Sequence, residues 1–452
     1  MNQSRKVLII AYLFPPIGGG GVQRALKMAR YLGDFGWEPH ILTVEPNYHV
    51  SLDYSLLEQL PDGVHIHRSR EIFLGAPPAA AGAKMEQAEA GSEAIGLTAR
   101  LKKKVFPTLK KLKRHVLVPD DQILWFPYAM RKGLEVVKEH QIDVLFSTSG
   151  PYTNHLVGLY LKRKTGLPWI ADFRDPWTQN MHRPGIAWRE WLEERLERMV
   201  LRESDLLLTV TQSFADNFQE KFEDEIKRLE VIHNGFDPED YKQLQGIKTD
   251  HPEQCTFIYT GIFYKERNPR LFLQAIKELI DEGKLARHEI RMNFAGVFDY
   301  PGYSENADWV GKLGLNDLVH VLGHLPHQAA LKELKKSDIL LLIGDTAPDS
   351  GAYIPGKLFE YMAIAKPILA LSLQGESTRI IERYQLGQVV DPGSLNDIKA
   401  GILALYEQWK NGNKQEKAAE RPSTLIYERR EQARLLAELL EELNRTAQKN
   451  KE

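Results

Sequence analysis

The sequence has very little cysteine and no excess of charge of either sign. Cys255 is the only cysteine among 452 residues, so an intramolecular disulfide and a metal site built from several cysteines are excluded. Lysine and arginine (59) nearly balance aspartate and glutamate (61), which leaves a net charge of -2. Such a balance gives no overall attraction to nucleic acid. We therefore expect a cytoplasmic protein that does not bind nucleic acid.

Long hydrophobic runs are also missing. No stretch reaches the roughly 20 apolar residues that a membrane-spanning helix needs, and the apolar run near the start is short for a signal peptide. The chain is too long for one hydrophobic core, so we expect more than one domain. A polar stretch at 238–254 suggests the boundary. We predict domains at 1–245 and 246–415, followed by a C-terminal segment, 416–452, whose helix packs back on the first domain.

Short apolar runs alternate with helical stretches along the whole chain. Residues 7–11 and 168–172 in the first half, and 256–260 and 339–343 in the second, have the character of buried strands. Strands that alternate with helices predict parallel sheets covered by helices on both faces. We therefore expect an α/β protein with two doubly wound, Rossmann-like domains that face a central cleft. Ligands of such folds bind beyond the carboxyl ends of the strands.

The stretch 345–371 carries the most informative pattern. A loop rich in Gly, Asp, Pro and Ser leads to Pro355-Gly356 and a helix from about residue 357. The free N–H groups and the positive dipole end of such a helix suit a phosphate, and Lys357 adds a cation. Glu360, one turn further on, could accept hydrogen bonds from two ribose hydroxyls. This spacing fits a nucleoside diphosphate; a helix whose Lys and Glu are merely solvated is the alternative.

A run of four glycines, Gly18 to Gly21, follows the first strand and precedes a helix. Glycine lets the backbone approach a ligand closely, and Pro15-Pro16 stiffens the start of the loop, so Gly19, Gly20 and Gly21 are candidate ligand contacts. The run lies too far from the strand for the G-x-G-x-x-G signature. A dinucleotide-binding dehydrogenase, with Glu45 as its acid, is therefore a distant alternative.

Two further strand-end loops carry clustered charge. The segment DFRDPW places Asp172, Arg174 and Asp175 together, which is more typical of a site than of a solvated turn. An Asp–Arg pair that braces the loop is the structural alternative. The segment GIFYKERNP, which begins at Gly261, places Lys265 and Arg267 just before a helix. Two cations there predict a second phosphate contact.

The segment 69–117 differs in composition from its surroundings. Its first part is small and polar, and we expect a mobile excursion there. Residues 100–117 carry many Lys and Arg, no acidic residue and interspersed apolar residues. A basic amphipathic segment of this kind can lie on an anionic membrane. We expect peripheral contact with the inner face of a membrane, or with a lipid substrate; a solvated loop helix is the alternative.

The order and spacing of these motifs resemble a known family. The chain contains, in order, FPPIGGGGVQR, STSGPYTNH, DFRDPW, VIHNGFD, YTGIFYKERNP, GHLP and IPGKLFEYMAIAKPILAL. Together they are similar to the family 4 glycosyltransferases of the GT-B fold, and in particular to bacterial enzymes that build surface glycans. The motifs are loose one by one, but the resemblance covers nearly the whole chain.

The resemblance implies a retaining transfer of a sugar from a nucleoside-diphosphate sugar to a glycan or lipid-linked acceptor, without a metal ion or other cofactor. It implies that Lys265 and Arg267 contact the donor phosphates and that Glu360 binds the ribose. The glycine loop would face the diphosphate. Asp172, Arg174 and Asp175 match the family's cluster near the reacting sugar and are the expected catalytic residues together with Arg267.

One position departs from the family pattern. The first glutamate of the family's E-x7-E motif would fall at Ala352. In its place we expect Asp349, or the backbone N–H groups of Ser350 and Gly351, to contact the donor, with Lys357 as a further phosphate contact. This departure leaves two alternatives open. One is a non-catalytic GT-B partner or scaffold. The other is a nucleotide-sugar epimerase that uses Asp172, Asp175 and His155.

Overall fold

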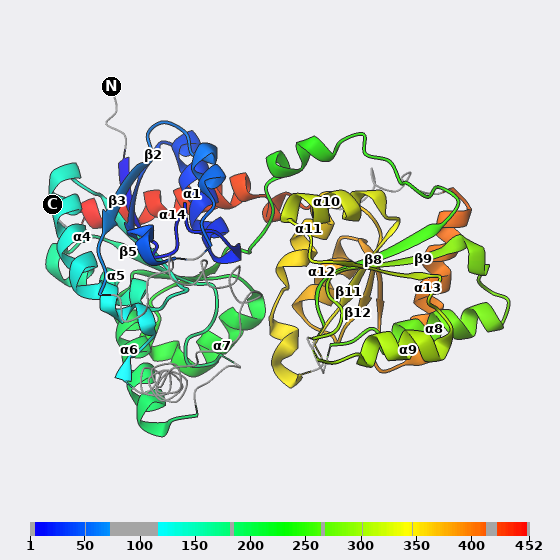
Figure 1. Ribbon diagram of the computed structural model, residues 1–452. Coiled ribbons are helices and arrows are strands. Elements are labelled where there is room, and N and C mark those ends of the chain that lie inside the picture. The colour runs from blue at the N-terminus through cyan, green and yellow to red at the C-terminus, as the bar shows by residue number, and fades with distance from the viewer. Residues whose placement is uncertain are drawn as a thin grey trace, which may run out of the picture. The chain divides into compact units, whose positions relative to one another are not determined.

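The chain forms two compact units in a computed structural model (Figure 1). The residues that the structure describes are 5–49, 51–72, 116–180, 185–263, 267–300, 302–345, 347–412 and 423–449. The first unit contains residues 1–233 and 429–452, and the second contains residues 234–428. The chain therefore changes unit before residue 245, the expected boundary. The reason is that Phe236 and Leu244 are buried in the core of the second unit.

The sheet of the first unit is parallel throughout. Its strands lie in the order β3-β2-β1-β4-β5-β6-β7. Side chains of successive residues in β1 enter different hydrophobic clusters: Leu8 and Ile10 enter one, Val7 and Ile9 the other. A strand that is buried on both faces is typical of a doubly wound fold. The strands are β1 (Arg5–Ile10), β2 (Trp37–Val44), β3 (His65–Ser69), β4 (Val144–Thr148), β5 (Trp169–Phe173), β6 (Leu206–Thr209) and β7 (Leu229–Val231).

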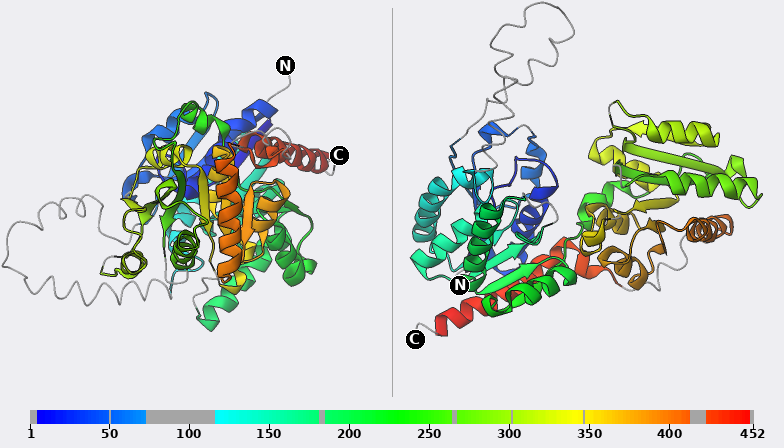
Figure 2. Two further views of the ribbon diagram at one scale, coloured as in Figure 1. Left: turned by 90° about the vertical axis from the view of Figure 1, so that its right-hand side faces the viewer. Right: turned by 90° about the horizontal axis from the view of Figure 1, so that it is seen from below.

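Helices cover both faces of this sheet (Figure 2). The helix α1 follows the glycine loop, and the C-terminal helix α14 packs against it, as predicted for a helix that returns to the first domain. Leu436 and Leu440 of α14 are fully buried in the cluster that α1 shares. The helices are α1 (Gln23–Leu32), α4 (Phe126–His140), α5 (Thr153–Thr165), α6 (Ala187–Glu203), α7 (Gln212–Phe222) and α14 (Arg429–Lys449).

The second unit repeats the architecture with a parallel sheet in the order β10-β9-β8-β11-β12-β13. Its strands are β8 (Cys255–Ile262), β9 (Ile290–Val297), β10 (Val319–Gly323), β11 (Ile339–Ile343), β12 (Ile368–Leu371) and β13 (Gly387–Val390). Its helices are α8 (Arg270–Asp281), α9 (Glu305–Leu313), α10 (His327–Lys336), α11 (Gly356–Ile364), α12 (Glu376–Arg383) and α13 (Leu395–Lys410). Two doubly wound α/β units confirm the expected fold class.

One prediction about the first unit is wrong in its bounds, and another is not tested. The excursion was expected to begin at Ser69, but Ser69 is the buried last residue of β3 and accepts a hydrogen bond from the indole of Trp125. The rest of that stretch, from residue 73, lies outside the described residues. The strand β3 has the sequence HIHRS, which lacks the apolar run by which the other strands were found. The expected basic segment, 100–117, lies outside the described residues except for its last two positions. None of the described helices is long and apolar enough to cross a bilayer.

Candidate functional site

Lys357 lies at the carboxyl end of β8. Its ammonium group donates a 2.9 Å hydrogen bond to the carbonyl oxygen of Thr260 and lies 4.0 Å from the ring centroid of Tyr259. Gly261 follows with φ of +134°, and a Cβ at this residue would lie 3.0 Å from the Lys357 nitrogen. Glycine is therefore needed here for its backbone conformation, and it also leaves room beside the lysine. Lys357, the first residue of α11 that carries a side chain, thus contacts the carboxyl end of β8.

Two other charged side chains, Arg267 and Glu360, lie near Lys357. Burial and, to a smaller extent, the nearby Arg267 lower the pKa of Lys357 to about 7, and Glu360 opposes the shift. Lys357, Arg267 and Glu360 therefore lie near one another at this edge of the sheet. One of the guanidinium nitrogens of Arg267 also lies 3.7 Å from the carboxylate of Asp345, just after β11. Lys265, the other predicted cation of this loop, lies outside the described residues.

Glu360 has a partner that sequence reasoning missed. Its carboxylate lies 3.0 Å from the Nε2 atom of His327, the first residue of α10. The hydrogen bond to Glu360 raises the pKa of His327. The signal in the sequence was the segment GHLPH, which follows a strand and ends in His327 at the start of a helix. Glu360 is half-buried, so its position is held while part of its carboxylate stays accessible.

The segment that replaces the missing glutamate is a 3₁₀ turn, Pro348–Ala352. The backbone N–H of Ser350 donates to the carbonyl oxygen of Ala347 at 3.0 Å, and its hydroxyl donates to the carbonyl oxygen of Asp345 at 2.9 Å. Ser350 therefore holds the turn together, so the expected use of its N–H for the donor needs correction. Gly351 packs closely on Gly375, where a Cβ would lie 2.3 Å from the Gly351 oxygen. The side chain of Asp349 lies outside the described residues.

The glycine loop of the first unit is exposed at its centre. Gly19 has φ of +103°, and a Cβ at Gly19 or Gly20 would meet no atom within 4 Å. The loop is fixed at both ends: the N–H of Gly18 donates to the carbonyl oxygen of Ser51 at 2.9 Å, and the carbonyl oxygen of Gly21 accepts from Arg174 at 2.7 Å. The exposed glycines between them leave room for a ligand and remain candidate contacts.

Asp172 is the centre of a buried network. Its carboxylate, which is 0% exposed, accepts hydrogen bonds from the Nε and Nη2 atoms of Arg24 at 2.9 and 2.7 Å and from the hydroxyl of Thr148 at 2.7 Å. Burial alone would raise the pKa of Asp172, but Arg24, together with the Thr148 hydroxyl and the charge of Arg174, holds that pKa below its usual value. Asp172 therefore positions the surrounding loops and does not reach a substrate in this structure, which favours the structural alternative.

Arg174 joins two loops. Its Nε donates to the carbonyl oxygen of Ser149 at 2.7 Å, and its Nη1 donates to that of Gly21. Gly150 makes room for the guanidinium, because a Cβ there would lie 2.3 Å from one of its nitrogens. Of the predicted cluster, Asp175 alone is exposed. The structure thus brings Arg174 to the glycine loop and leaves Asp175 as the accessible carboxylate of the motif.

The epimerase alternative depended on an accessible histidine. His155 is fully buried, stacks on Phe173 with ring centroids 4.2 Å apart, and shares a 2.8 Å hydrogen bond between its Nδ1 and the hydroxyl of Ser147. Burial lowers the pKa of His155 to about 3. A histidine that is packed in this way cannot exchange protons with a substrate, so the structure gives the epimerase alternative no support.

Metal-ligating side chains gather elsewhere in the first unit. Among the described residues, His40, His67 and His140 form one group with the spacing of a metal site, and Glu38, His40 and His65 form another. Burial, with the nearby histidines, lowers the pKa of His40 and of His67 to about 4, although the hydrogen bond that Glu38 accepts from His40 opposes the shift at His40. Both rings are therefore neutral at pH 7. Sequence reasoning missed these groups because it missed β3.

Three solved structures show the same fold at low sequence identity. HepE of Anabaena, in complex with UDP and glucose, has a TM-score of 0.57 and 15% identity over 97% of this chain and 100% of that chain. WaaG, a glycosyltransferase involved in lipopolysaccharide biosynthesis, has a TM-score of 0.53 and 15% identity over 96% and 99%. The UDP-GlcNAc 2-epimerase of Methanocaldococcus jannaschii has a TM-score of 0.52 and 14% identity over 96% and 99%. Among curated proteins, no match is found.

Two family models match the chain in sequence. The one described as "Glycosyltransferase Family 4" matches residues 18–240, and the one described as "Glycosyl transferases group 1" matches residues 242–421. They cover the two halves in turn and leave out little more than the ends. With two doubly wound units as its fold, the chain belongs to the family 4 glycosyltransferases of the GT-B fold.

Proposed function

We propose that this glycosyltransferase takes its sugar from a nucleoside-diphosphate sugar held by the second unit, and transfers it with retention of the anomeric configuration. The observation that carries the proposal is the grouping of Lys357, Arg267 and Glu360 at the carboxyl end of β8. Lys357 and Arg267 match phosphates that need positive charge, and the Glu360 carboxylate matches a ribose that offers two hydroxyls to one acceptor.

The phosphates would bind between Lys357, Arg267 and the N-terminus of α11. Gly356 is exposed at the start of this helix and would meet no atom if it carried a Cβ, so a ligand can approach the backbone closely. The N–H groups and dipole of the helix then add to the charge of the two side chains. Lys265 remains a proposed third cation.

The ribose would bind Glu360. One of its oxygens already accepts from His327, so the other is available for the two hydroxyls. The hydrogen bond to His327 orients the carboxylate before the donor arrives, which lowers the entropy lost on binding. Gly261, beside Lys357, would let the donor approach the end of β8 closely.

During transfer, negative charge develops on the leaving diphosphate, and the enzyme must stabilise this charge above all. Lys357 and Arg267 are preorganised for this task, since both are held near the phosphate position before the reaction. The bond between the anomeric carbon and the phosphate oxygen breaks, and a bond from the same carbon to the acceptor oxygen forms. The acceptor's proton passes to the leaving phosphate. Asp172 is buried and paired and cannot act as a covalent nucleophile. We infer attack on the face from which the phosphate leaves.

We further propose that transfer needs no metal ion. In many enzymes of phosphate chemistry a divalent cation balances the charge of the diphosphate. Here Lys357 and Arg267 supply two positive charges at that place. The metal-ligating groups of the described residues, around His40, belong to the first unit and not to the unit that carries these cations.

The acceptor proposed here is a glycan or lipid-linked precursor of a cell-surface polysaccharide. The basic segment 100–117 supports this, as does the fold that the chain shares with a transferase of lipopolysaccharide biosynthesis. The helix α6 adds Trp188 and Trp191, whose side chains are 51% and 63% exposed. Tryptophan favours the membrane–water interface. We expect the protein to bind anionic vesicles but not neutral ones, and the double variant Trp188→Ser/Trp191→Ser to bind the anionic vesicles less. Equal binding to both kinds of vesicle, or binding to neither, would refute membrane contact.

The decisive experiment is calorimetric titration of the protein with UDP, GDP and dTDP in turn. One nucleotide should bind, and Arg267→Ala should weaken its binding by about tenfold or more, as expected for a charge-assisted contact. Arg287→Ala is the matched control, because Arg287 is a surface arginine of the same unit that pairs with Asp317. Binding to none of the three would overturn the donor site. Binding without transfer of the matching sugar to any acceptor would favour the scaffold alternative.

A further inference from the structure

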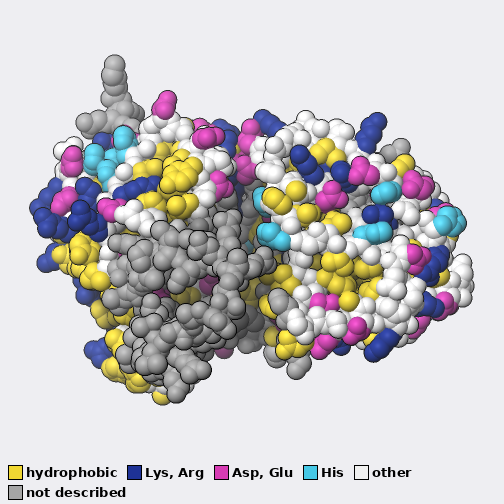
Figure 3. Space-filling view, in the orientation of Figure 1, with side chains coloured by type: hydrophobic (Ala, Val, Ile, Leu, Met, Phe, Trp, Pro, Cys, Tyr) yellow, Lys and Arg dark blue, Asp and Glu magenta, His cyan; other side chains and the backbone are white. Residues whose placement is uncertain are grey.

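Four histidines lie close together at one edge of the first unit, where histidine side chains gather on the surface (Figure 3). His40 belongs to β2, His65 and His67 belong to β3, and His140 is the last residue of α4. In the parallel pairing of the two strands, His40 lies opposite His65, and Leu42 lies opposite His67. His65 and His67 are two residues apart and therefore point to the same face of the edge strand. The helix α4 packs over both strands and brings His140 to this face.

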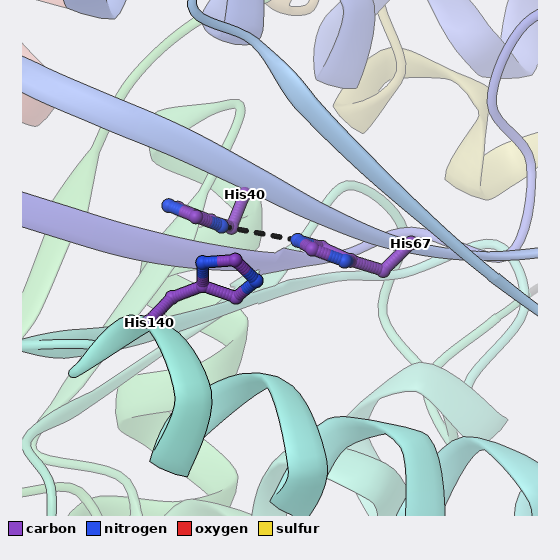
Figure 4. Close-up of side chains that lie close together, drawn as sticks. All are labelled: His40, His67 and His140. Atoms are coloured by element: carbon purple, nitrogen blue, oxygen red, sulfur yellow. Dashed lines mark hydrogen bonds between the residues drawn. The ribbon is translucent and has the colours of Figure 1, made fainter.

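Three of these rings face one another (Figure 4). The Nδ1 atom of His40 lies 3.0 Å from the Nε2 atom of His67. The ring centroid of His140 lies 4.6 Å from that of His40 and 4.9 Å from that of His67. One nitrogen of each ring lies within 4.8 Å of the other two. Side chains from two strands and one helix thus bring three imidazole nitrogens within 4.8 Å of one another.

We propose that His40, His67 and His140 form a binding site for a divalent transition metal ion of the zinc class. Imidazole nitrogen suits Zn²⁺, Cu²⁺ and Ni²⁺, and three histidines with one water complete a tetrahedral zinc site. Zinc–nitrogen bonds of about 2.0–2.1 Å place two ligand nitrogens about 3.3 Å apart. The pair His40 and His67 already has nearly this spacing, at 3.0 Å. Rotation of the His140 side chain, which is partly exposed, closes the third contact.

Glu38 determines which nitrogen of His40 is available. Its carboxylate lies 3.0 Å from the Nε2 atom of His40 and 3.1 Å from that of His65. A hydrogen bond from Nε2–H to this carboxylate leaves Nδ1 without a proton and directed toward His67. Carboxylates orient metal-ligating histidines in this way in many metal sites. Glu38 and His65 therefore support the site from behind, and the second group of potential ligands, Glu38, His40 and His65, is not the one that we propose.

The remaining charges around the rings are mixed. Lys132 of α4 acts on His67, and Lys6 lies 3.8 Å from Glu38, while Glu139 lies 4.0 Å from His140. The role of the ion would be structural. It would connect β3, the edge strand of the sheet, to β2 and to the end of α4, and it would resist local opening of this edge. The proposal is independent of the donor site, which belongs to the other unit.

The test uses the full chain, stripped of metal with a chelator and titrated with Co²⁺, whose visible absorption reports its geometry, and with Zn²⁺ alone. One equivalent of tetrahedral Co²⁺ should bind, and Zn²⁺ should raise the thermal midpoint of the protein. His140→Ala and His67→Ala should each weaken binding by more than tenfold and abolish the rise in midpoint. His65→Ala, the matched control from the same strand, should leave the tetrahedral spectrum in place and weaken binding by less than tenfold.

His140→Ala is the most informative variant, because a partly exposed residue at the end of a helix can be replaced without unfolding the chain; circular dichroism confirms that it is folded. Lack of binding by the wild-type protein would overturn the proposal. So would binding that survives in both His140→Ala and His67→Ala. Loss of binding in His65→Ala alone would place the ion between Glu38, His40 and His65 and would equally refute the site proposed here.

Discussion

The guanidinium group of Arg24 holds both carboxylate oxygens of Asp172, with distances of 2.9 Å from Nε to Oδ2 and 2.7 Å from Nη2 to Oδ1. Arg24 lies in the first turn of α1, directly after the glycine loop, and Asp172 lies near the end of β5. The pair therefore fixes the start of α1 to the centre of the sheet. Arg174, two residues on, holds the carbonyl oxygen of Gly21. The motif expected to carry the chemistry thus also shapes the glycine loop.

Arg24→Met should destabilise the protein by about 3–5 kcal/mol, because it leaves the buried carboxylate of Asp172 without its counter-charge. The control is Arg163→Met, which removes an exposed arginine from its pair with Glu203 and should cost less than about 1 kcal/mol. Denaturant unfolding followed by circular dichroism measures both. The double variant Arg24→Met/Asp172→Asn should recover part of the loss. Equal effects of Arg24→Met and Arg163→Met would contradict the structural role assigned to the buried pair.

Binding of a nucleoside diphosphate should weaken as the pH rises above 7. Burial, with Arg267 beside it, lowers the pKa of Lys357 to about 7, so the free protein loses this positive charge as the pH rises through that value. The ligand binds the charged form, and its terminal phosphate, with a pKa near 6, stays doubly negative over this range. The dissociation constant should therefore rise by roughly tenfold between pH 7 and 8.5.

Lys357→Arg is the control for this pH dependence, because arginine keeps its charge at every pH used. Its binding, measured by calorimetry with the same nucleotide, should change little between pH 7 and 8.5. A wild-type profile as flat as that of Lys357→Arg would show that Lys357 is not the titrating contact, whatever the absolute affinities.

The ribose contact predicts a preference for ribonucleotides. If UDP or GDP is the nucleotide bound, the wild-type protein should bind it about tenfold more tightly than its 2′-deoxy form, because a hydrogen bond to a charged acceptor contributes about 1.5–3 kcal/mol. Glu360→Ala should bind both forms with similar, weaker affinity. His327→Ala, the control, keeps the carboxylate and should retain the preference. Competition titrations measure all three. A preference that survives in Glu360→Ala would remove Glu360 from the ribose site.

Much of the fold follows from local patterns. The runs Val7 to Ala11 and Ile339 to Ile343 are apolar throughout, and a continuous apolar run between turn signals is sufficient to predict a buried parallel strand. The strand β3 was missed for the opposite reason. Its sequence HIHRS places two histidines on one face, and a polar edge strand has no apolar run to detect. With it the histidine group was missed, because three of the four histidines come from β2 and β3.

The candidate donor residues were found because they stand directly after predicted strands, where a parallel sheet collects side chains from distant parts of the chain. The roles of particular residues were harder to predict. The pairing of Ser350 with Ala347 and Asp345, the burial of Asp172 and the contact between Glu360 and His327 all depend on side-chain directions. Neither composition nor spacing carries those directions.

Apart from β3, the sequence by itself determined the order of strands and helices and the position of the loops that follow the strands, because those features depend on the periodicity of a few neighbouring residues. Only the tertiary structure decided which side chains meet. Arg24 reaches Asp172 across 148 positions of the chain and Lys357 reaches Thr260 across 97. Such contacts depend on strand order and register, which bring distant residues to one edge of a sheet and leave no local pattern in the sequence.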